Sequence, residues 1–118
     1  MHKPFARILF KWNSTETKRM ERFQFAHPHQ AELLVEIADS SLHYDRTVKN
    51  SLYAKAGIVE YWIVNLVDGQ LEVYRQPIPD PDAEYGFRYA EVRIYQSGEQ
   101  VAPQGLSVGV VAVDDLLL

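Results

Sequence analysis

The apolar run at residues 33–38 constrains the fold more than any other segment of the chain. It reads Leu-Leu-Val-Glu-Ile-Ala, so it is apolar on both faces except at Glu36. A short run of this kind predicts a strand in the middle of a sheet that is covered on both sides. Leu34 and Ala38 lie two positions from Glu36 and therefore share its face. A carboxylate buried in this way costs several kcal/mol unless a cation or a metal offsets it.

Three interpretations are open for Glu36. It can belong to a functional site with a metal or a charged partner, it can form a structural ion pair, or it can lie exposed on an edge strand. We favour the functional site, because a lysine follows on the next predicted element.

Residues 45–56 predict that element, a helix. Asp45 suits its N-cap or first turn, and Gly57 follows as a C-terminal stop. Residues that recur at helical spacing form an apolar stripe, which we expect to pack on the sheet. These residues are Val48, Leu52 and Ala56.

Asp45, Lys49 and Tyr53 form a polar stripe beside the apolar one, since each lies four residues after the last. Lys49 would then lie at the border of the packed face, where it can reach the end of the Glu36 strand. The alternative is an ordinary surface pair of Asp45 and Lys49, which contributes a few tenths of a kcal/mol.

The rest of the chain predicts further strands, and so an α/β fold with a mixed sheet and one main helix packed on a face. We expect Tyr61 and Trp62 to belong to the core rather than to stack on bases. The predicted elements are strands at residues 61–64, 71–75, 85–94 and 106–111, turns at Asp68-Gly69 and Ser97-Gly98, a loop at Pro77, Pro79 and Pro81, and a helical turn at residues 113–118 capped by Asp114.

Composition narrows the function classes. The chain of 118 residues has no cysteine, which excludes disulfides, thiolate zinc sites and cysteine nucleophiles and fits a reducing cytoplasm. No apolar run approaches the roughly 18 residues of a membrane span. The net charge of −4 argues against a protein that binds nucleic acid by bulk electrostatics, although residues 1–30 are basic. Those residues are a solvated arm or, alternatively, an arm that contacts phosphates.

Residues 31–75 carry a family resemblance. They read AELLVEIADSSLHYDRTVKNSLYAKAGIVEYWIVNLVDGQLEVYR. The run contains an apolar strand with its glutamate, a serine-rich turn, Asp-x-x-x-Lys, Tyr-Ala-x-Ala-Gly and Glu-Tyr-Trp-Ile-Val. In these motifs the chain closely resembles the Uma-two family of restriction endonucleases, within the PD-(D/E)XK nuclease-like superfamily. The resemblance extends from about residue 27 to the end of the chain.

The resemblance implies a restriction-endonuclease-like fold and a metal-dependent endonuclease that hydrolyses phosphodiester bonds of DNA. The implied metal is Mg²⁺, with Mn²⁺ as a substitute. Glu36 matches the metal-binding glutamate. A standard Glu-x-Lys motif has its lysine two residues after the glutamate, where this chain has Ala38. In the Uma-two pattern the lysine that positions the attacking water lies on the following helix instead, and Lys49 matches it. Asp45 matches the acid that orients this lysine.

The chain departs from the family upstream of Glu36, where the family has a metal-binding aspartate on a preceding strand. No aspartate precedes Asp39. We therefore expect a poorly matched basic segment at residues 1–26, a nuclease-like domain at residues 27–118, and a sheet that is incomplete at its N-terminal side. A homodimer could cover that side, and a non-catalytic remnant that acts as an interaction or dimerisation module is the alternative function. Three acids lie upstream of Glu36, namely Glu16, Glu21 and Glu32. Of these, Glu16 or Glu21 could replace the aspartate.

Overall fold

The fold is built on a five-stranded sheet with a separate two-stranded sheet beside it. We describe a computed structural model, which places residues 8–12, 33–104 and 109–117. The strands are β1 (Ile8–Trp12), β2 (Leu33–Ala38), β3 (Glu60–Asn65), β4 (Gln70–Pro79), β5 (Phe87–Tyr95), β6 (Gln100–Val101) and β7 (Val111–Ala112), and the helical elements are α1 (Leu42–Tyr44), the π-helical turn η3 (Asp45–Lys49), α2 (Asn50–Lys55) and α3 (Val113–Leu117).

The large sheet is mixed. Its order is β1-β2-β3-β4-β5. The first three strands run parallel, and β4 and β5 are antiparallel to their neighbours. β2 lies between β1 and β3 and is buried along its whole length, which confirms the predicted central strand. The sequence prediction did not include β1.

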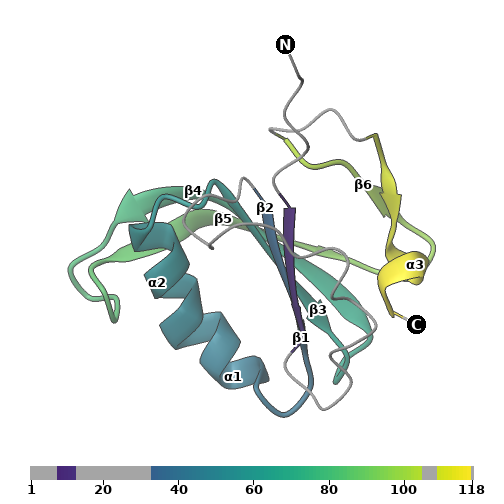
Figure 1. The fold of residues 1–118 in the computed structure, drawn as a ribbon, viewed down its shortest axis with the longest axis horizontal. Helices are drawn as coiled ribbons and strands as arrows, with labels where there is room; N and C mark the ends of the chain where they lie inside the picture. The colour runs from purple at the N-terminus through teal and green to yellow at the C-terminus, as the bar shows by residue number, and fades with distance from the viewer. Residues whose placement is uncertain (1–7, 13–32, 105–108, 118) are drawn as a thin grey trace.

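The two faces of this sheet are covered by different parts of the chain (Figure 1). The helical segment α1–η3–α2 covers one face, and β6, β7 and α3 lie on the other. Tyr61 and Trp62 are neighbours on β3 and therefore point into opposite layers, where both are almost completely buried. This confirms that they belong to the core. It also confirms the predicted α/β fold class, a mixed sheet with one main helix on a face.

The main helix begins earlier than predicted. Residues 42–55 are helical without a break, and Ser41 occupies the N-cap. The prediction of Asp45 as N-cap is therefore wrong, and Asp45 lies inside the helix as the acid in the first turn of η3. The predicted end is confirmed: Ala56 is the C-cap, and Gly57 follows with φ 82°, a backbone conformation that favours glycine.

The helix also packs on the sheet through a different face from the predicted one. Leu52 is 40% exposed, whereas Tyr53 and Ala54 are buried. The cause is the π-helical turn, in which the N–H of Asn50 bonds to the carbonyl of Asp45 five residues earlier. Such a turn holds one residue more than an α-helical turn, so it advances the buried stripe by one position.

Two of the three clustered prolines lie in a strand and not in the predicted loop, whereas Pro81 lies in the turn that follows the strand. Pro77 and Pro79 lie in β4, opposite Tyr89 and Phe87 of β5. β4 pairs with β3 only as far as Arg75, so beyond that residue no other described strand adjoins its second edge. Proline is tolerated at such an edge because it has no ladder hydrogen bond to interrupt there.

The C-terminal part agrees with the prediction in its turn and its helix. Gly98 has φ 92° at the predicted turn, and α3 is the predicted helical turn. Asp114 lies in its first turn and accepts a 2.6 Å hydrogen bond from the Ser97 hydroxyl. Within the predicted strand at residues 106–111, residue 111 lies in β7, residues 109 and 110 are not in a strand, and the first residues lie outside the described ones. Glu16, Glu21 and the rest of residues 13–32 also lie outside them.

Candidate functional site

Glu36 is completely buried between β2 and the helix. Its carboxylate accepts a 2.7 Å hydrogen bond from the Tyr53 hydroxyl and a 3.2 Å hydrogen bond from the Tyr61 hydroxyl. The Lys49 ammonium lies 3.4 Å and 3.5 Å from the two carboxylate oxygens. These contacts exclude the exposed edge position, while an ion pair and a functional site both fit them.

Lys49 bridges two buried acids. Its Nζ atom is 3.4 Å from Oε1 of Glu36 and 3.6 Å from Oδ1 of Asp45. The lysine side chain is 19% exposed, and both carboxylates are buried. The pair of Asp45 and Lys49 is therefore not an ordinary surface pair. The ring of the exposed Tyr44 lies 5.8 Å from Nζ on the outer side.

Asp45 reaches this site because η3 turns it toward the sheet. The Ser41 hydroxyl donates a 3.2 Å hydrogen bond to Oδ2 of Asp45. Burial and the nearby charge of Glu36 raise the pKa of Asp45 to about 6, although Lys49 lowers it. The structure thus brings together all three site residues that the sequence predicted.

Two tyrosines hold Glu36, and the sequence prediction, which placed Tyr53 in the polar stripe, assigned neither of them to this carboxylate. Their rings meet edge to face with centroids 5.1 Å apart. Burial and the charge of Glu36 raise the pKa of both phenols, so they remain protonated and can donate. The position of Tyr53, four residues after Lys49, is a signal that could have found it. No signal marks Tyr61, because a tyrosine in an apolar strand is typical of a core residue.

The comparison with family models matches this chain over residues 8–114. The matching model is Uma2, described as "Putative restriction endonuclease". The chain belongs to the Uma2 family. A comparison with curated proteins gives no match. The Uma2 match spans β1, the helix and the complete large sheet, and the description of the family suggests a nuclease function with DNA as a partner.

The strand beside Glu36 carries no acid in this Uma2 chain. β1 reads Ile-Leu-Phe-Lys-Trp, and Lys11 occupies the register position next to Glu36. The upstream metal-binding aspartate that the family resemblance implies is therefore not in β1.

The remaining residues of the site are suited to a divalent metal. Glu36 and Asp45 supply hard carboxylate oxygens, the donor type that Mg²⁺ prefers. Within the described ranges, no group of three or more acidic or histidine side chains gathers at one place. Mg²⁺ usually keeps several waters and binds through one or two carboxylates plus substrate phosphates, so Glu36 alone, or Glu36 together with Asp45, is enough for a site of this type.

A second buried acid faces the same layer of this Uma2 domain. Ile63 of β3 lies in register with Glu36 on one side and with Glu72 on the other. Glu72 accepts hydrogen bonds from Arg46, Asn65 and Tyr74. Burial alone would raise the pKa of Glu72, but these hydrogen bonds outweigh it and lower the pKa. Glu72 therefore forms a structural ion pair with Arg46, and this pair serves as an internal comparison for Glu36.

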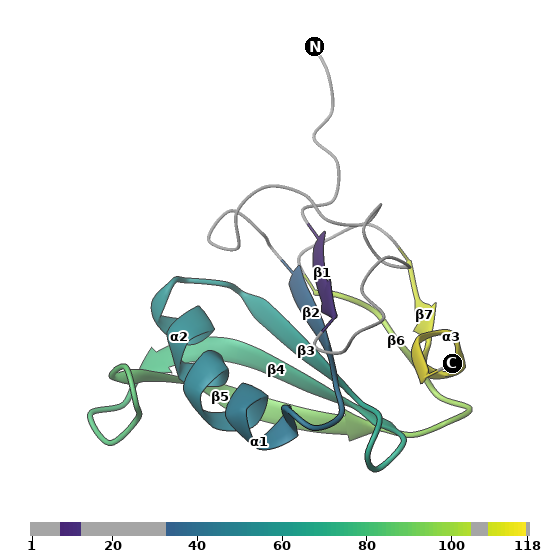
Figure 2. The ribbon, with the colours of Figure 1, turned by 60° about the horizontal axis from the view of Figure 1, so that its bottom comes forward.

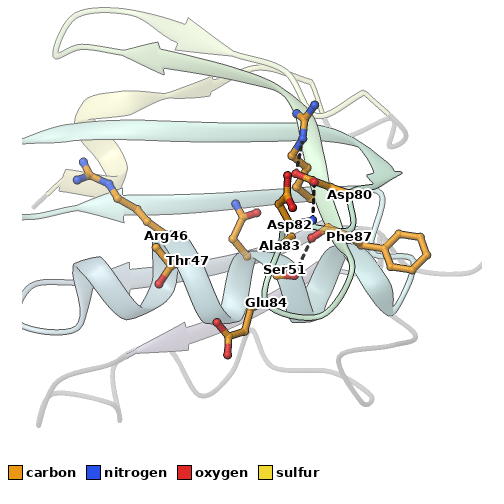
Figure 3. A pocket seen from close by; sticks show the side chains of 10 residues that line it. Arg46, Thr47, Ser51, Asp80, Asp82, Ala83, Glu84 and Phe87 are labelled. Atoms are coloured by element: carbon orange, nitrogen blue, oxygen red, sulfur yellow. Dashed lines mark hydrogen bonds and ion pairs between the residues drawn. The ribbon is translucent and has the colours of Figure 1, made fainter.

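A shallow cavity lies elsewhere, between the helix and the loop that joins β4 to β5 (Figure 3). Its volume is about 340 Å³, and Glu36 is not among its lining residues. The Ser51 hydroxyl at its base donates a 2.6 Å hydrogen bond to the carbonyl of Phe87 and accepts a 2.8 Å bond from the N–H of Tyr85. Arg88 pairs with Asp80 at 3.0 Å. The two hydrogen bonds of Ser51 fasten the loop to the helix, and the Arg88–Asp80 pair closes the loop itself.

None of the helices in the described part of the chain is long and apolar enough to cross a membrane.

Proposed function

We propose that this Uma2 domain is a divalent-metal-dependent nuclease that hydrolyses phosphodiester bonds of DNA. One observation carries the proposal: a strand and the following helix bring two buried carboxylates, Glu36 and Asp45, to either side of the Lys49 ammonium. The family membership supports a nuclease function in general. The absence of cysteine further supports a cytoplasmic location.

Each residue of the site has a distinct role in this proposal. Glu36 binds the metal, Mg²⁺ or Mn²⁺, and the bound ion would lower the pKa of the attacking water and neutralise charge on the phosphate. Tyr53 and Tyr61 keep the Glu36 carboxylate in one orientation through their hydrogen bonds. Asp45 positions Lys49, with which it is in contact. Lys49 is the only one of the three site residues with an exposed fraction, so it can orient the water and stabilise negative charge on the phosphate.

The test is a calorimetric titration with Mg²⁺ and Mn²⁺ of the native chain, Glu36→Gln and Glu72→Gln. Both variants remove one negative charge from a buried glutamate in the same layer, so Glu72→Gln controls for changes in packing. We expect saturable binding in the native chain and in Glu72→Gln, and none in Glu36→Gln. Equal binding by all three proteins would contradict the role of Glu36.

Cleavage is tested separately, by the nicking of supercoiled plasmid DNA in Mg²⁺. We expect Lys49→Met to lose nicking while it keeps metal binding, because the lysine acts on the water and the phosphate rather than on the ion. A Lys49→Met variant that nicks DNA at the native rate would remove Lys49 from the mechanism.

Lys11 favours a second candidate function, in which the domain is not catalytic and serves as an interaction module. This residue occupies the register position beside Glu36, in a strand without acids. The variant Lys11→Asp places a carboxylate there and separates the two functions. If the native chain is inactive and Lys11→Asp gains metal binding and nicking, the native domain is a nuclease fold that lacks one ligand. If both proteins are inactive, the nuclease proposal fails.

A further inference from the structure

The outer edge of β5 is a long strand edge that no other strand of the described residues adjoins. β5 ends the order of the large sheet and pairs with β4 on its inner side only, so in the part of the chain that the structure describes no strand adjoins its outer side. Figure 2 shows β5 as the outermost strand, beyond β4. Val92 is 53% exposed and Ile94 45% exposed. Free N–H and C=O groups along such an edge are a template for another strand.

The two faces of this edge differ in chemistry. Val92 and Ile94 lie opposite β4 residues of the helix-bearing layer, whereas Glu91 and Arg93 lie opposite β4 residues of the other layer. Glu91 and Arg93 form a 2.7 Å ion pair along the strand. In β4, Gln76 follows Arg75, the partner of Glu91, and its φ of 66° bends the strand there. The regular part of the β5 edge is therefore residues 90–94. One side of the edge is therefore apolar, and the other carries one charge of each sign.

This edge is complementary to itself. When two copies of residues 90–94 run antiparallel about Val92, the two valines face each other and Ala90 faces Ile94 of the other copy. Glu91 then faces Arg93 twice, once on each side of the two-fold axis. A register centred on Glu91 or on Arg93 instead would place like charges directly opposite, which is destabilising. Among the isologous registers of residues 90–94, the one centred on Val92 is favoured, because it alone places Glu91 opposite Arg93.

We propose that β5 pairs antiparallel with β5 of a second copy of this chain, in the register centred on Val92, and so extends the sheet across a two-fold dimer. The contact is a narrow one, so the dimer forms reversibly in the micromolar to millimolar range. β5 lies at the opposite end of the sheet from β1 and is separated from β2 by two strands. The dimer contact therefore lies away from the strand that carries Glu36, and the inference is independent of the proposed nuclease function.

Sedimentation velocity over a series of concentrations tests the dimer with charge-reversed variants. Glu91→Arg places two guanidinium groups opposite each other across the interface, and Arg93→Glu places two carboxylates opposite each other. We expect each variant alone to dimerise about tenfold more weakly than the native chain, since each dimer contains two such pairs. An equimolar mixture of the two variants should dimerise at least as well as the native chain, because every facing pair is then oppositely charged.

The double variant Glu91→Arg/Arg93→Glu restores both pairings within one chain and should dimerise like the native protein. Thermal unfolding followed by circular dichroism shows that each variant is folded. A native chain that stays monomeric at the highest concentration would overturn the proposal. A mixture that associates no better than its components, or single variants that dimerise like the native chain, would overturn it as well.

Discussion

Lys49→Met removes the ammonium that lies between two buried carboxylates. The methionine keeps most of the aliphatic stem, so the variant loses charge more than volume. Glu36 and Asp45 then remain in the same layer without that cation, at 0% exposure in both cases. The change tests whether the contact of Lys49 stabilises the fold or merely accompanies it.

The distances give the expected size of the effect. At 3.4 Å and 3.6 Å, each attraction amounts to about 5 kcal/mol in an effective dielectric of about 20. Desolvation of the ammonium offsets much of this gain, and removing one partner of a buried pair costs about 3–5 kcal/mol in practice. Because the lysine keeps 19% exposure, we expect the lower end of that range, about 3 kcal/mol in the free energy of unfolding.

Urea unfolding followed by circular dichroism in EDTA measures this cost without a metal contribution. Lys55→Met is the matched control, since Lys55 is exposed on the same helix and its loss should change stability by less than about 0.5 kcal/mol. In a Glu36→Gln background, the cost of Lys49→Met should fall by about 1–3 kcal/mol, because one of the two acids is neutral there. A cost below about 1 kcal/mol, or the same cost in both backgrounds, would refute this account of the site.

Three further predictions follow from the same layer of the fold. Tyr53→Phe deletes a 2.7 Å hydrogen bond to a buried carboxylate and should cost about 1.5–3 kcal/mol in urea unfolding; a neutral effect would contradict the bond. Leu52→Gln should change stability by less than about 0.5 kcal/mol, whereas Ala54→Leu should cost about 1–3 kcal/mol by overpacking, and the reverse order would contradict the helix face described here. The folded-state pKa of Glu72 lies below its ordinary value of 4.5, so its contribution to stability is complete above that pH and is lost as the pH falls through the lowered pKa. Glu72→Gln should therefore flatten the acid side of a plot of unfolding free energy against pH, and an unchanged slope would refute the lowered pKa.

The parts of the fold that depend on local pattern could be predicted from the sequence. The central strand follows from its uninterrupted apolar run, and the hairpin turn follows from Asp68-Gly69. The proline strand could not be predicted, because Pro77 is allowed there only by the end of β3 on the neighbouring side. β1 could not be predicted either, since its parallel partner lies far along the chain and its five residues show no clear alternation.

The site was predictable in its charges and not in its packing. Glu36 and Lys49 were found because an acid in an apolar strand needs a cation, and the next helix offers one. The depth of Asp45 was missed because a 3.6-residue period cannot reveal a π-helical turn. Tyr61 was missed because a core aromatic and a hydrogen-bond donor to a carboxylate look the same in sequence.

Because of the π-helical turn, the number of residues in this helix decides which side chains face the sheet as much as their types do. If η3 were wound as a regular α-helix with the same number of residues, everything after it would be rotated by about 100° about the helix axis. Tyr53 and Ala54 would swing toward solvent, and the sheet would receive Leu52 in place of the donor to Glu36. The loss of one residue from η3 outside the site residues would instead remove the extra residue and leave Tyr53 and Ala54 on the sheet, so natural variation in this segment should include chains that are one residue shorter and have no π-helical turn.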